Sequence, residues 1–391
     1  MTPAARAAAA IEVLDRWLAG EAVGRALKAW ARGARYAGSS DRRAVRDLVF
    51  DVLRKRRSAG WLGRGQDGRA LVLGLARLDA VEPALWFSGA RHAPPPLTAA
   101  EGQEPPPLDE APQAVRLDWP DWLWREAEES LGEACPAALE HLRHRAAVTL
   151  RVNLARIGRE AARAALAEAG VATRPVPEVA SALVVEGELR NLDRLALWRE
   201  GLVELQDAAS QAVVEALPIE AGMRVLDLCA GGGGKTLAMA ARAPLQLFCH
   251  DAAPRRMADL PARARRAGIA PVMLAGEDGP ERHGPFDLVL ADVPCSGSGA
   301  WARDPEGKWR LTPVRRAALL EAQKAILDRA AALVVSGGAL AYATCSLLGA
   351  ENEGRIADFL DRVPGWSLER ECRWLPGRPG DGFYLAVLRR N

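Results

Sequence analysis

The chain has 391 residues, of which 49% are hydrophobic and 26% are charged, and its formal net charge is +2. This length is greater than one hydrophobic core usually fills, so we expect two or three domains. No stretch reaches the roughly 18 apolar residues of a membrane helix, and residues 1–10 lack the apolar core of a secretory signal, which predicts a cytoplasmic protein without a membrane segment.

The cysteines argue against structural metal or disulfide sites. The six cysteines form no CxxC pair and no ladder of short spacings. This pattern is unlike a zinc ribbon or a disulfide framework. Free thiols are typical of a reducing compartment, so we expect a cytoplasmic protein that holds no metal.

Charge is distributed unevenly along the chain. Residues 1–92 carry 17 Lys+Arg against 9 Asp+Glu, whereas the remainder carries 35 against 41. A basic surface attracts polyanions, because phosphate neutralisation supplies most non-specific affinity for nucleic acids. A solvated arginine-rich face explains the same composition, and the charge count alone does not separate the two interpretations.

Residues 1–92 are predicted to form a small all-helical domain. Apolar residues recur there at helical spacing, as in Ile11, Leu14, Trp17 and Leu18, and in Val45, Leu48, Val49, Val52 and Leu53. A basic run, Arg54-Lys-Arg-Arg, follows the second of these patterns. It is either a charge cluster at the C-terminus of a helix, where the helix dipole favours cations, or a contact for phosphate.

A proline-rich linker is predicted at residues 93–113, because proline lacks an amide donor and restricts the residue before it. Residues 114–200 then predict a small α+β segment. Residues 119–142 are helical in pattern, residues 148–153 alternate like a strand, residues 158–169 form a helix, and a second β-rich stretch surrounds residues 182–185.

From residue 201 to the end, short β-rich runs alternate with helical stretches. Strands are predicted at residues 224–228, 246–250, 271–274, 287–291 and 339–343, with helices at 235–241, 254–267 and 313–335. This alternation predicts βαβ units in a doubly wound, mostly parallel sheet with helices on both faces. The closing stretch at residues 382–388 reads as an added antiparallel strand.

A glycine-rich turn lies where the first of these strands meets the first helix: Val225-Leu-Asp-Leu-Cys-Ala-Gly-Gly-Gly-Gly-Lys-Thr. It is not a Walker A loop, because Cys229 stands where that motif has glycine, and Thr236 breaks the GxGxxG fingerprint. Free amides at such a turn receive an anionic or polar ligand group. Carboxylates follow the next strands, namely Asp251, then Glu277 or Asp278, then Asp292, and together they favour a nucleoside cofactor over ordinary strand-end caps.

Two cysteines lie just beyond two apolar runs. Cys295 follows the run that begins at Asp287, and Cys345 follows the run that begins at Ala339. Adjacent strands are about 4.8 Å apart, so the two thiols occupy one pocket if their strands are neighbours. Inert buried thiols are the commonest alternative for free cysteines.

These residues resemble the RsmB-type branch of the Nop/Sun family of S-adenosylmethionine-dependent RNA cytosine-5 methyltransferases. The matching segments are Gly201-Leu-Val-Glu-Leu-Gln-Asp-Ala-Ala-Ser, Asp227-Leu-Cys-Ala-Gly-Gly-Gly-Gly-Lys-Thr, Asp292-Val-Pro-Cys-Ser-Gly-Ser-Gly, Tyr342-Ala-Thr-Cys-Ser with Glu351-Asn-Glu, and Gly380-Asp-Gly-Phe-Tyr. DNA cytosine-5 methyltransferases have the Pro-Cys motif without a Thr-Cys-Ser partner. Residues 40–54 are similar to the NusB-like RNA-binding domain of this branch.

The resemblance implies a Rossmann-like methyltransferase domain at residues 201–391 and S-adenosylmethionine as cofactor. The cofactor-binding residues carried over from the family are Cys229, Ala230, Gly231, Gly232, Gly233, Gly234, Lys235, Asp251, Arg256, Glu277 and Asp292. Glu277 aligns by its spacing from Gly268, whereas Asp278 aligns by the glycine after it. Gly232 stands where the family usually has proline, and Gly231 where it has alanine, which leaves a more flexible turn.

The resemblance also assigns the chemistry. Cys345 adds to carbon 6 of cytosine, Asp292 hydrogen-bonds or protonates the ring nitrogen N3, and Cys295 assists release of the product. Lys235 supports the cofactor pocket or the target base. The implied substrate is 16S ribosomal RNA, with tRNA as an alternative, and the implied state is a monomer. Two rival interpretations remain: a methyltransferase for DNA or a small molecule, and an RNA-binding assembly factor with little or no catalysis.

Overall fold

The computed structural model describes residues 1–276, 278–377 and 380–391, which form two compact units. Unit 1 consists of residues 1–145 and 301–310, and unit 2 consists of residues 146–300 and 311–391. The chain therefore leaves unit 2 after residue 300, contributes residues 301–310 to unit 1, and re-enters unit 2 at residue 311. In the described part of the chain, no helix combines the length and the apolar character needed to cross a bilayer.

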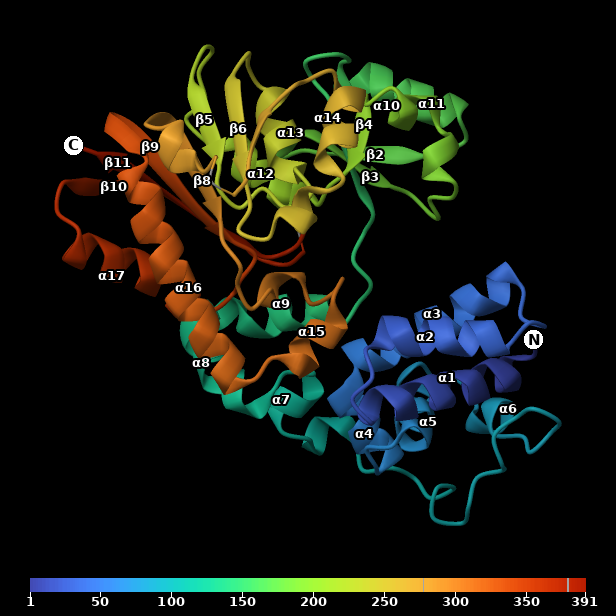
Figure 1. The fold of residues 1–391 in the computed structure, drawn as a ribbon. Coiled ribbons are helices and arrows are strands. Elements are labelled where there is room, and N and C mark those ends of the chain that lie inside the picture. Colours follow the sequence, from blue (N-terminus) through green and yellow to red (C-terminus); the bar gives the residue numbers. More distant parts are fainter. Residues whose placement is uncertain (277, 378–379) are drawn as a thin grey trace. The chain divides into compact units, whose positions relative to one another are not determined.

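The described residues of unit 1 form helices and loops, with no strand among them (Figure 1). Its helices are α1 (Pro3–Leu18), α2 (Val23–Gly33), α3 (Ser39–Arg54), α4 (Arg56–Gly63), α5 (Gly68–Leu78), α6 (Pro83–Trp86), α7 (Gln113–Arg116), α8 (Asp121–Leu131), α9 (Cys135–Leu142) and α15 (Pro305–Arg310). The apolar spacing noted in the sequence places Leu14 and Trp17 of α1 and Val49 and Val52 of α3 in one buried core. The prediction of helices in residues 1–92 is confirmed.

Residues 301–310 are held in unit 1 by contacts at the C-terminal end of α3. The last carbonyls of a helix have no partner within it, so side chains from elsewhere often supply one. Trp309 Nε1 donates to Leu53 O at 2.6 Å, and Lys308 Nζ donates to Arg54 O at 3.2 Å. Trp301 also packs against Trp119, with ring centroids 4.7 Å apart. No motif in the sequence indicated these long-range contacts.

Residues 114–145 pack with the helices before them, whereas the sequence grouped them with the strands after them. The cause is a buried carboxylate. Asp118 accepts from the backbone amides of Arg57 and Ser58 at the N-terminus of α4 and from Arg143 Nε, at 2.8, 2.9 and 2.8 Å. The boundaries at residues 92, 113 and 200 stay predictions, but the compact units divide the chain at residue 145.

Unit 2 begins with a four-stranded antiparallel sheet in the order β2-β3-β1-β4. Its strands are β1 (Thr149–Val152), β2 (Thr173–Val176), β3 (Val179–Val185) and β4 (Val203–Leu205), with helices α10 (Arg159–Glu168) and α11 (Ala196–Arg199) between them. Leu150 and Val152 of β1, Leu183 of β3 and Leu166 of α10 form its core. The strands and the helix expected at residues 148–185 are confirmed.

The rest of unit 2 contains a seven-stranded sheet in the order β10-β11-β9-β8-β5-β6-β7. The strands are β5 (Arg224–Asp227), β6 (Gln246–His250), β7 (Val272–Leu274), β8 (Phe286–Asp292), β9 (Val334–Thr344), β10 (Trp366–Trp374) and β11 (Phe383–Arg390). Strands β5 to β9 are parallel, and β11 joins them antiparallel as predicted. Strand β10 was not predicted, because its mostly exposed residues lack an apolar run.

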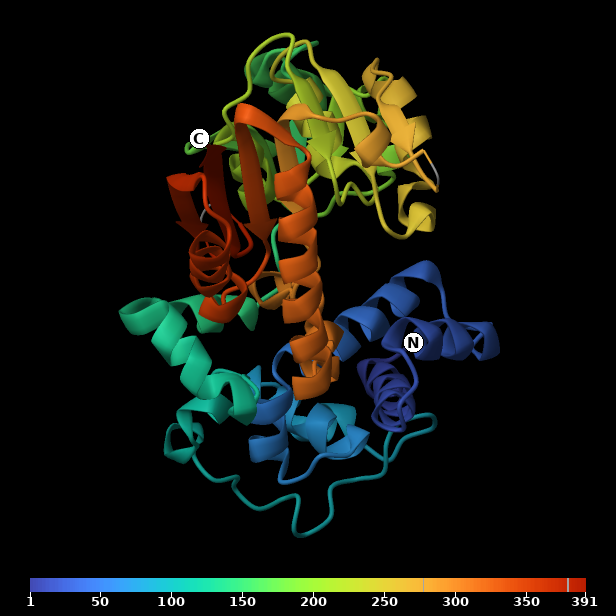
Figure 2. The ribbon, with the colours of Figure 1, turned by 60° about the vertical axis from the view of Figure 1, so that its left-hand side comes forward.

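Helices cover both faces of this sheet (Figures 1 and 2). They are α12 (Ala208–Glu215), α13 (Gly234–Ala240), α14 (Leu260–Ala267), α16 (Pro313–Ala332) and α17 (Glu353–Arg362). Side chains of a strand alternate between faces, so Val289 of β8 packs in the core with α16 and α17, while Leu288 and Leu290 pack in the core with α12 and α13. The doubly wound, mostly parallel fold is confirmed.

Candidate active site

The two cysteines meet at the carboxyl ends of β8 and β9, which are parallel neighbours. Strand β8 ends at Asp292, three residues before Cys295, and β9 ends directly before Cys345. The two sulfur atoms are 3.5 Å apart, and both cysteines are free. This distance confirms the prediction that neighbouring strands bring the two thiols together.

The two thiols differ in their surroundings. A hydrogen bond to Cys345, together with burial and the nearby Glu351 carboxylate, raises the pKa of Cys295 well above its usual value. Cys295 therefore keeps its proton, and its sulfur lies within hydrogen-bond distance of the Cys345 sulfur.

The segments that carry the thiols, residues 293–299 and 345–348, are here called the thiol loops. Glu351 is fully buried beneath them. It accepts from the amide of Ser296 at 2.8 Å, from the hydroxyls of Ser296 and Ser346, and from Gln323 Nε2 at 3.0 Å. One carboxylate thus fixes the residue after each cysteine. The sequence marked the Glu351 segment only as part of the resemblance and did not assign this positioning role.

Further contacts join the thiol loops to each other. Asn352 accepts from Thr344 Oγ1 at 2.6 Å and donates to Ser346 O at 3.0 Å. The amide of Gly299 donates to Cys345 O at 2.9 Å, so the backbone of one loop is bonded to the cysteine of the other. These contacts hold both cysteines in a fixed geometry.

Asp292 and Lys235 form an ion pair beside the thiols. Lys235 Nζ lies 2.7 Å from Asp292 Oδ2 and 4.9 Å from the centroid of the Phe383 ring. Burial by itself would lower the pKa of Lys235, but Asp292 offsets this and the net shift is upward. Lys235 is therefore a buried, charged donor. The structure brings both predicted residues together, with Asp292 partly open to solvent.

The glycine turn, residues 229–234, needs glycine at particular points. Gly231 and Gly233 have φ values of 51° and 80°, and a side chain at Gly233 would collide with Leu260. The amide of Gly231 donates to Asp251 Oδ2 at 3.0 Å, and Arg256 Nη1 lies 3.1 Å from the same oxygen. Asp251 and Arg256 therefore border this turn, as predicted.

Two arginines hold the turn at the position where the family proline is missing. Arg263 of α14 donates to Gly232 O, and its other terminal nitrogen lies 3.1 Å from Glu204 Oε2. Arg151 of β1 donates to Gly234 O and to Gln206 Oε1, both at 2.7 Å. Hydrogen bonds from distant segments thus fix carbonyls of a turn that the sequence predicted to be flexible.

The other predicted carboxylates lie apart from this turn or outside the described residues. Asp278 is largely exposed and hydrogen-bonds to His283 Nε2 at 2.7 Å. Glu277 lies outside the described residues. No cluster of His, Cys, Asp or Glu suited to a metal ion occurs among residues 1–276, 278–377 and 380–391.

Comparisons with known proteins identify the fold and the family. A family model described as 16S rRNA methyltransferase RsmB/F matches residues 214–389, and a model of the RsmF/B-like ferredoxin-like domain matches residues 119–190. The Ribosomal RNA small subunit methyltransferase B of Vibrio cholerae is 34% identical over 294 residues, which cover 71% of this chain and 67% of that protein. The chain belongs to the RsmB/F methyltransferase family.

Other relatives agree with this assignment. The Probable ribosomal RNA small subunit methyltransferase B of Synechocystis is 33% identical over 65% of this chain, and the match spans 59% of that protein. The crystal structure of PH0851 matches the whole chain with a TM-score of 0.75 at 23% identity, covering 99% of that chain. A methyltransferase homolog from Pyrococcus horikoshii matches 71% of this chain and 98% of its own, with a TM-score of 0.61 at 22% identity. These structures share the fold.

As an RsmB/F methyltransferase, the chain takes its methyl group from S-adenosylmethionine. The residues at the glycine turn fit such a ligand. Asp227, the last residue of β5, is buried, and its Oδ1 has no partner among the described residues, whereas Oδ2 accepts from Thr236 Oγ1 at 2.7 Å. Burial raises the pKa of Cys229 to about 12, so this thiol stays protonated and packs at the turn as an uncharged side chain.

Proposed function

We propose that this protein transfers a methyl group from S-adenosylmethionine to carbon 5 of a cytosine in small-subunit ribosomal RNA. The observation that carries the proposal is the 3.5 Å separation of the Cys295 and Cys345 sulfurs at neighbouring strand ends. Carbon 5 of cytosine is a poor nucleophile until a thiolate adds to carbon 6, so the reaction requires a cysteine. The second cysteine and the ion pair beside it supply the proton transfers that this route needs.

In the first step, the Cys345 thiolate forms a bond to carbon 6 and electrons move toward carbon 5 and N3. We assign to the protonated Cys295 the hydrogen bond that stabilises this thiolate before the attack, across the 3.5 Å between the two sulfurs. Asp292 lies at the end of β8, and its Oδ2 accepts a hydrogen bond from the ammonium group of Lys235 at 2.7 Å. We assign to Asp292 the hydrogen bond to N3, and to Lys235 the charge that supports it.

When bound, S-adenosylmethionine supplies the methyl group as an electrophile on a sulfonium. After the methyl group has joined carbon 5, the proton on that carbon must leave before the bond between Cys345 and carbon 6 breaks. Once Cys345 is bound to carbon 6, Cys295 releases its own proton to solvent, and the resulting thiolate is the proposed base that takes the proton from carbon 5, directly or through a water molecule. The electrons of the broken C5–H bond form the double bond between carbons 5 and 6, and the bond to carbon 6 breaks with the Cys345 thiolate as the leaving group.

Ribosomal RNA is proposed because curated relatives that are 33–34% identical carry the name ribosomal RNA small subunit methyltransferase B. The excess of arginine and lysine in residues 1–92 suits a polyanionic substrate. The test is a bisulfite map of ribosomal and transfer RNA from a strain without the gene, with and without the gene restored. We expect one small-subunit cytosine to lose its protection and to regain it when the wild-type gene returns.

Restoring a Cys345→Ala gene is the matched control, and it should leave that cytosine unprotected. If the strain without the gene loses a methylated cytosine in tRNA and none in ribosomal RNA, the substrate is tRNA and the proposed ribosomal substrate is wrong. An unchanged map, combined with calorimetric binding of S-adenosylmethionine, would instead favour an RNA-binding role without this methylation.

A further inference from the structure

Unit 1 contains a pocket of about 640 Å³ beside the first turn of α4. Its lining includes Arg56, Arg57, Arg64, Trp61, Gln66 and Trp309. Arg64 and Gln66 are exposed, while Arg56 and Trp309 are half-buried. Cationic and aromatic side chains therefore share one concave surface in the basic part of the chain.

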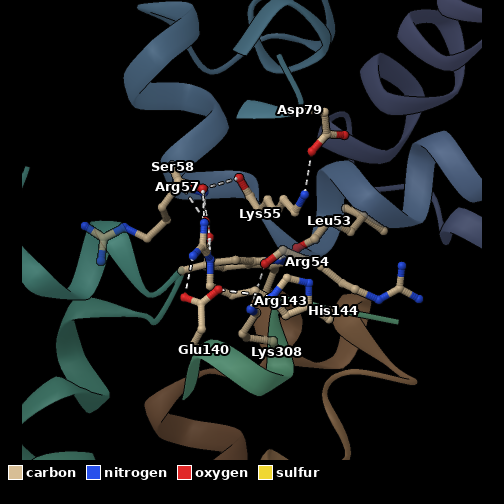
Figure 3. Close-up of polar contacts among 12 residues, drawn as sticks. Leu53, Arg54, Lys55, Arg57, Ser58, Asp79, Glu140, Arg143, His144 and Lys308 are labelled. Atoms are coloured by element: carbon tan, nitrogen blue, oxygen red, sulfur yellow. Dashed lines mark hydrogen bonds and ion pairs between the residues drawn. The ribbon is translucent and has the colours of Figure 1, made fainter. Parts of the chain in front are cut away.

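Three of the four cations in the Arg54–Arg57 run are engaged by other groups of unit 1, and Figure 3 shows one of these contacts, the ion pair of Lys55 with Asp79. Arg54 Nη1 donates to Asp51 at 2.8 Å and its Nε to Ala302 O at 2.9 Å. Lys55 pairs with Asp79 at 2.7 Å, and Arg57 pairs with both oxygens of Asp121. These three residues stabilise unit 1, and Arg54 and Lys55 lie at the C-terminus of α3, where the helix-end interpretation places them.

Arg56 is the exception in this run. Its guanidinium carbon lies 5.1 Å from the ring centroid of Trp17 and 5.3 Å from that of Trp309. Its Nε is buried without an acceptor, and Arg56 has no ion pair with any residue in the described part of the chain. The rings hold the guanidinium in place, and its N–H groups stay available to an acceptor.

Neighbouring groups leave the pocket positively charged. Arg64 donates to Glu104 O and to Gln103 Oε1, which are uncharged acceptors. The exposed carboxylate of Asp121 is matched by Arg57. Burial, and after it the charge of Arg57, lower the pKa of Arg56, because holding a half-buried cation without a counter-charge has a free-energy cost. An anion bound at Arg56 would offset that cost.

We propose that this pocket binds a phosphate group of the RNA substrate, with the Arg56 guanidinium as its main contact. Arginine matches phosphate through paired N–H groups, and the Trp61 ring beside it offers a stacking face for a base. This inference rests on the proposed function, because it takes RNA as the ligand. Arg64 and Gln66 at the exposed rim extend the contact along the RNA backbone.

The test compares Arg56→Gln with Arg42→Gln in the full-length protein, because Arg42 is an exposed arginine of α3 outside the pocket. Binding of a fluorescent small-subunit RNA fragment is measured by anisotropy over a series of salt concentrations. We expect Arg56→Gln to weaken binding about tenfold, as for one charge-assisted hydrogen bond, and to reduce the salt slope by about one. Arg42→Gln should stay close to wild type.

Arg56→Lys keeps the charge but loses the paired donors, so its affinity for RNA should lie between those of wild type and Arg56→Gln. If Arg56→Gln does not fold, a weaker affinity of Arg56→Lys than of wild type decides the question. Inorganic phosphate should displace RNA from wild type better than chloride at equal ionic strength, and this difference should vanish in Arg56→Gln. Equal binding and equal salt slopes for wild type and both Arg56 variants would overturn the site.

The outcomes also separate the site from the proposed function. If Arg56→Gln weakens RNA binding while the wild type methylates no cytosine, the phosphate site stands and the proposed reaction fails. If wild type methylates RNA and the Arg56 variants bind it normally, the reaction stands and the site fails. Phosphate displacement with unchanged RNA affinity would point to a small phosphate ligand and would overturn the RNA assignment.

Discussion

The thiol loops and the glycine turn lie at the carboxyl ends of neighbouring strands of one sheet, yet they are held in different ways. In the thiol loops, Glu351 and Asn352 bond to the residues beside the cysteines, and all of these residues fall within recognisable motifs. In the glycine turn, Arg151 and Arg263 come from β1 and α14, far from the turn in sequence. The geometry of the thiol loops thus rests on residues of their own motifs, whereas the geometry of the glycine turn rests on two arginines that lie outside the motifs.

The largest expected effect is a pH dependence of stability that originates beneath the glycine turn. Burial raises the pKa of Asp227 to about 7, so its carboxyl is neutral in the folded protein at pH values where the unfolded chain ionises. Unfolding then releases a proton, and stability falls as pH rises from about 4 to about 7 by roughly 4 kcal/mol. Asp227→Asn should remove this slope in denaturant unfolding measured across that range.

Asp259→Asn is the matched control for this measurement, because Asp259 is an exposed residue that precedes α14. It should keep the wild-type slope. If the free energy of unfolding of Asp227→Asn changed with pH in parallel to that of wild type, Asp227 would be ionised in the folded state.

The second effect concerns the thiol loops. Glu351→Gln replaces one acceptor oxygen with an NH₂ group and leaves donors from Ser296, Ser346 or Gln323 unsatisfied. We expect a loss of about 3 kcal/mol in the free energy of unfolding, as for a buried charged acceptor. Displacement of the cysteines should lower kcat about a hundredfold with little change in the affinity for S-adenosylmethionine.

Glu353→Gln serves as control, since Glu353 lies in the same segment but is more exposed, and among the described residues its ion pair is a long 3.5 Å contact with Arg373. It should be close to wild type in both measurements. If Glu351→Gln kept the wild-type kcat, the thiol loops would not depend on this carboxylate.

The smallest effect is a change in cofactor affinity. Arg263→Ala removes the donor to Gly232 O and frees the turn at the position where the family has proline. The Kd for S-adenosylmethionine should rise about tenfold, as for a lost charge-assisted hydrogen bond, while the KM for RNA stays unchanged. Calorimetry measures the first quantity and steady-state kinetics the second.

Arg265→Ala, on the exposed side of the same helix, should bind the cofactor like wild type. Equal affinities for the two variants would mean that the four glycines keep their conformation without Arg263, and the contrast between the two regions would disappear.

The sequence predicted those parts of the molecule that depend on local pattern. Short β-rich runs between helical stretches predicted the parallel strands, and the positions of the Pro-Cys and Thr-Cys-Ser motifs at two strand ends placed Cys295 and Cys345 together. It did not reveal the bracing by Arg151 and Arg263 or the return of residues 301–310 to unit 1, because these contacts join distant segments. Strand β10 was missed since its exposed side chains carry no apolar pattern, and pairing with β11 makes it a strand.

The most direct test of the account is covalent trapping on RNA. Cys295→Ala and Cys345→Ala are each incubated with small-subunit RNA and S-adenosylmethionine and then separated on a denaturing gel. If Cys345 adds to carbon 6 and Cys295 assists release, Cys295→Ala should accumulate a denaturation-resistant protein–RNA adduct and Cys345→Ala should form none. An adduct in Cys345→Ala, with none in Cys295→Ala, would contradict the assignment of the two thiols.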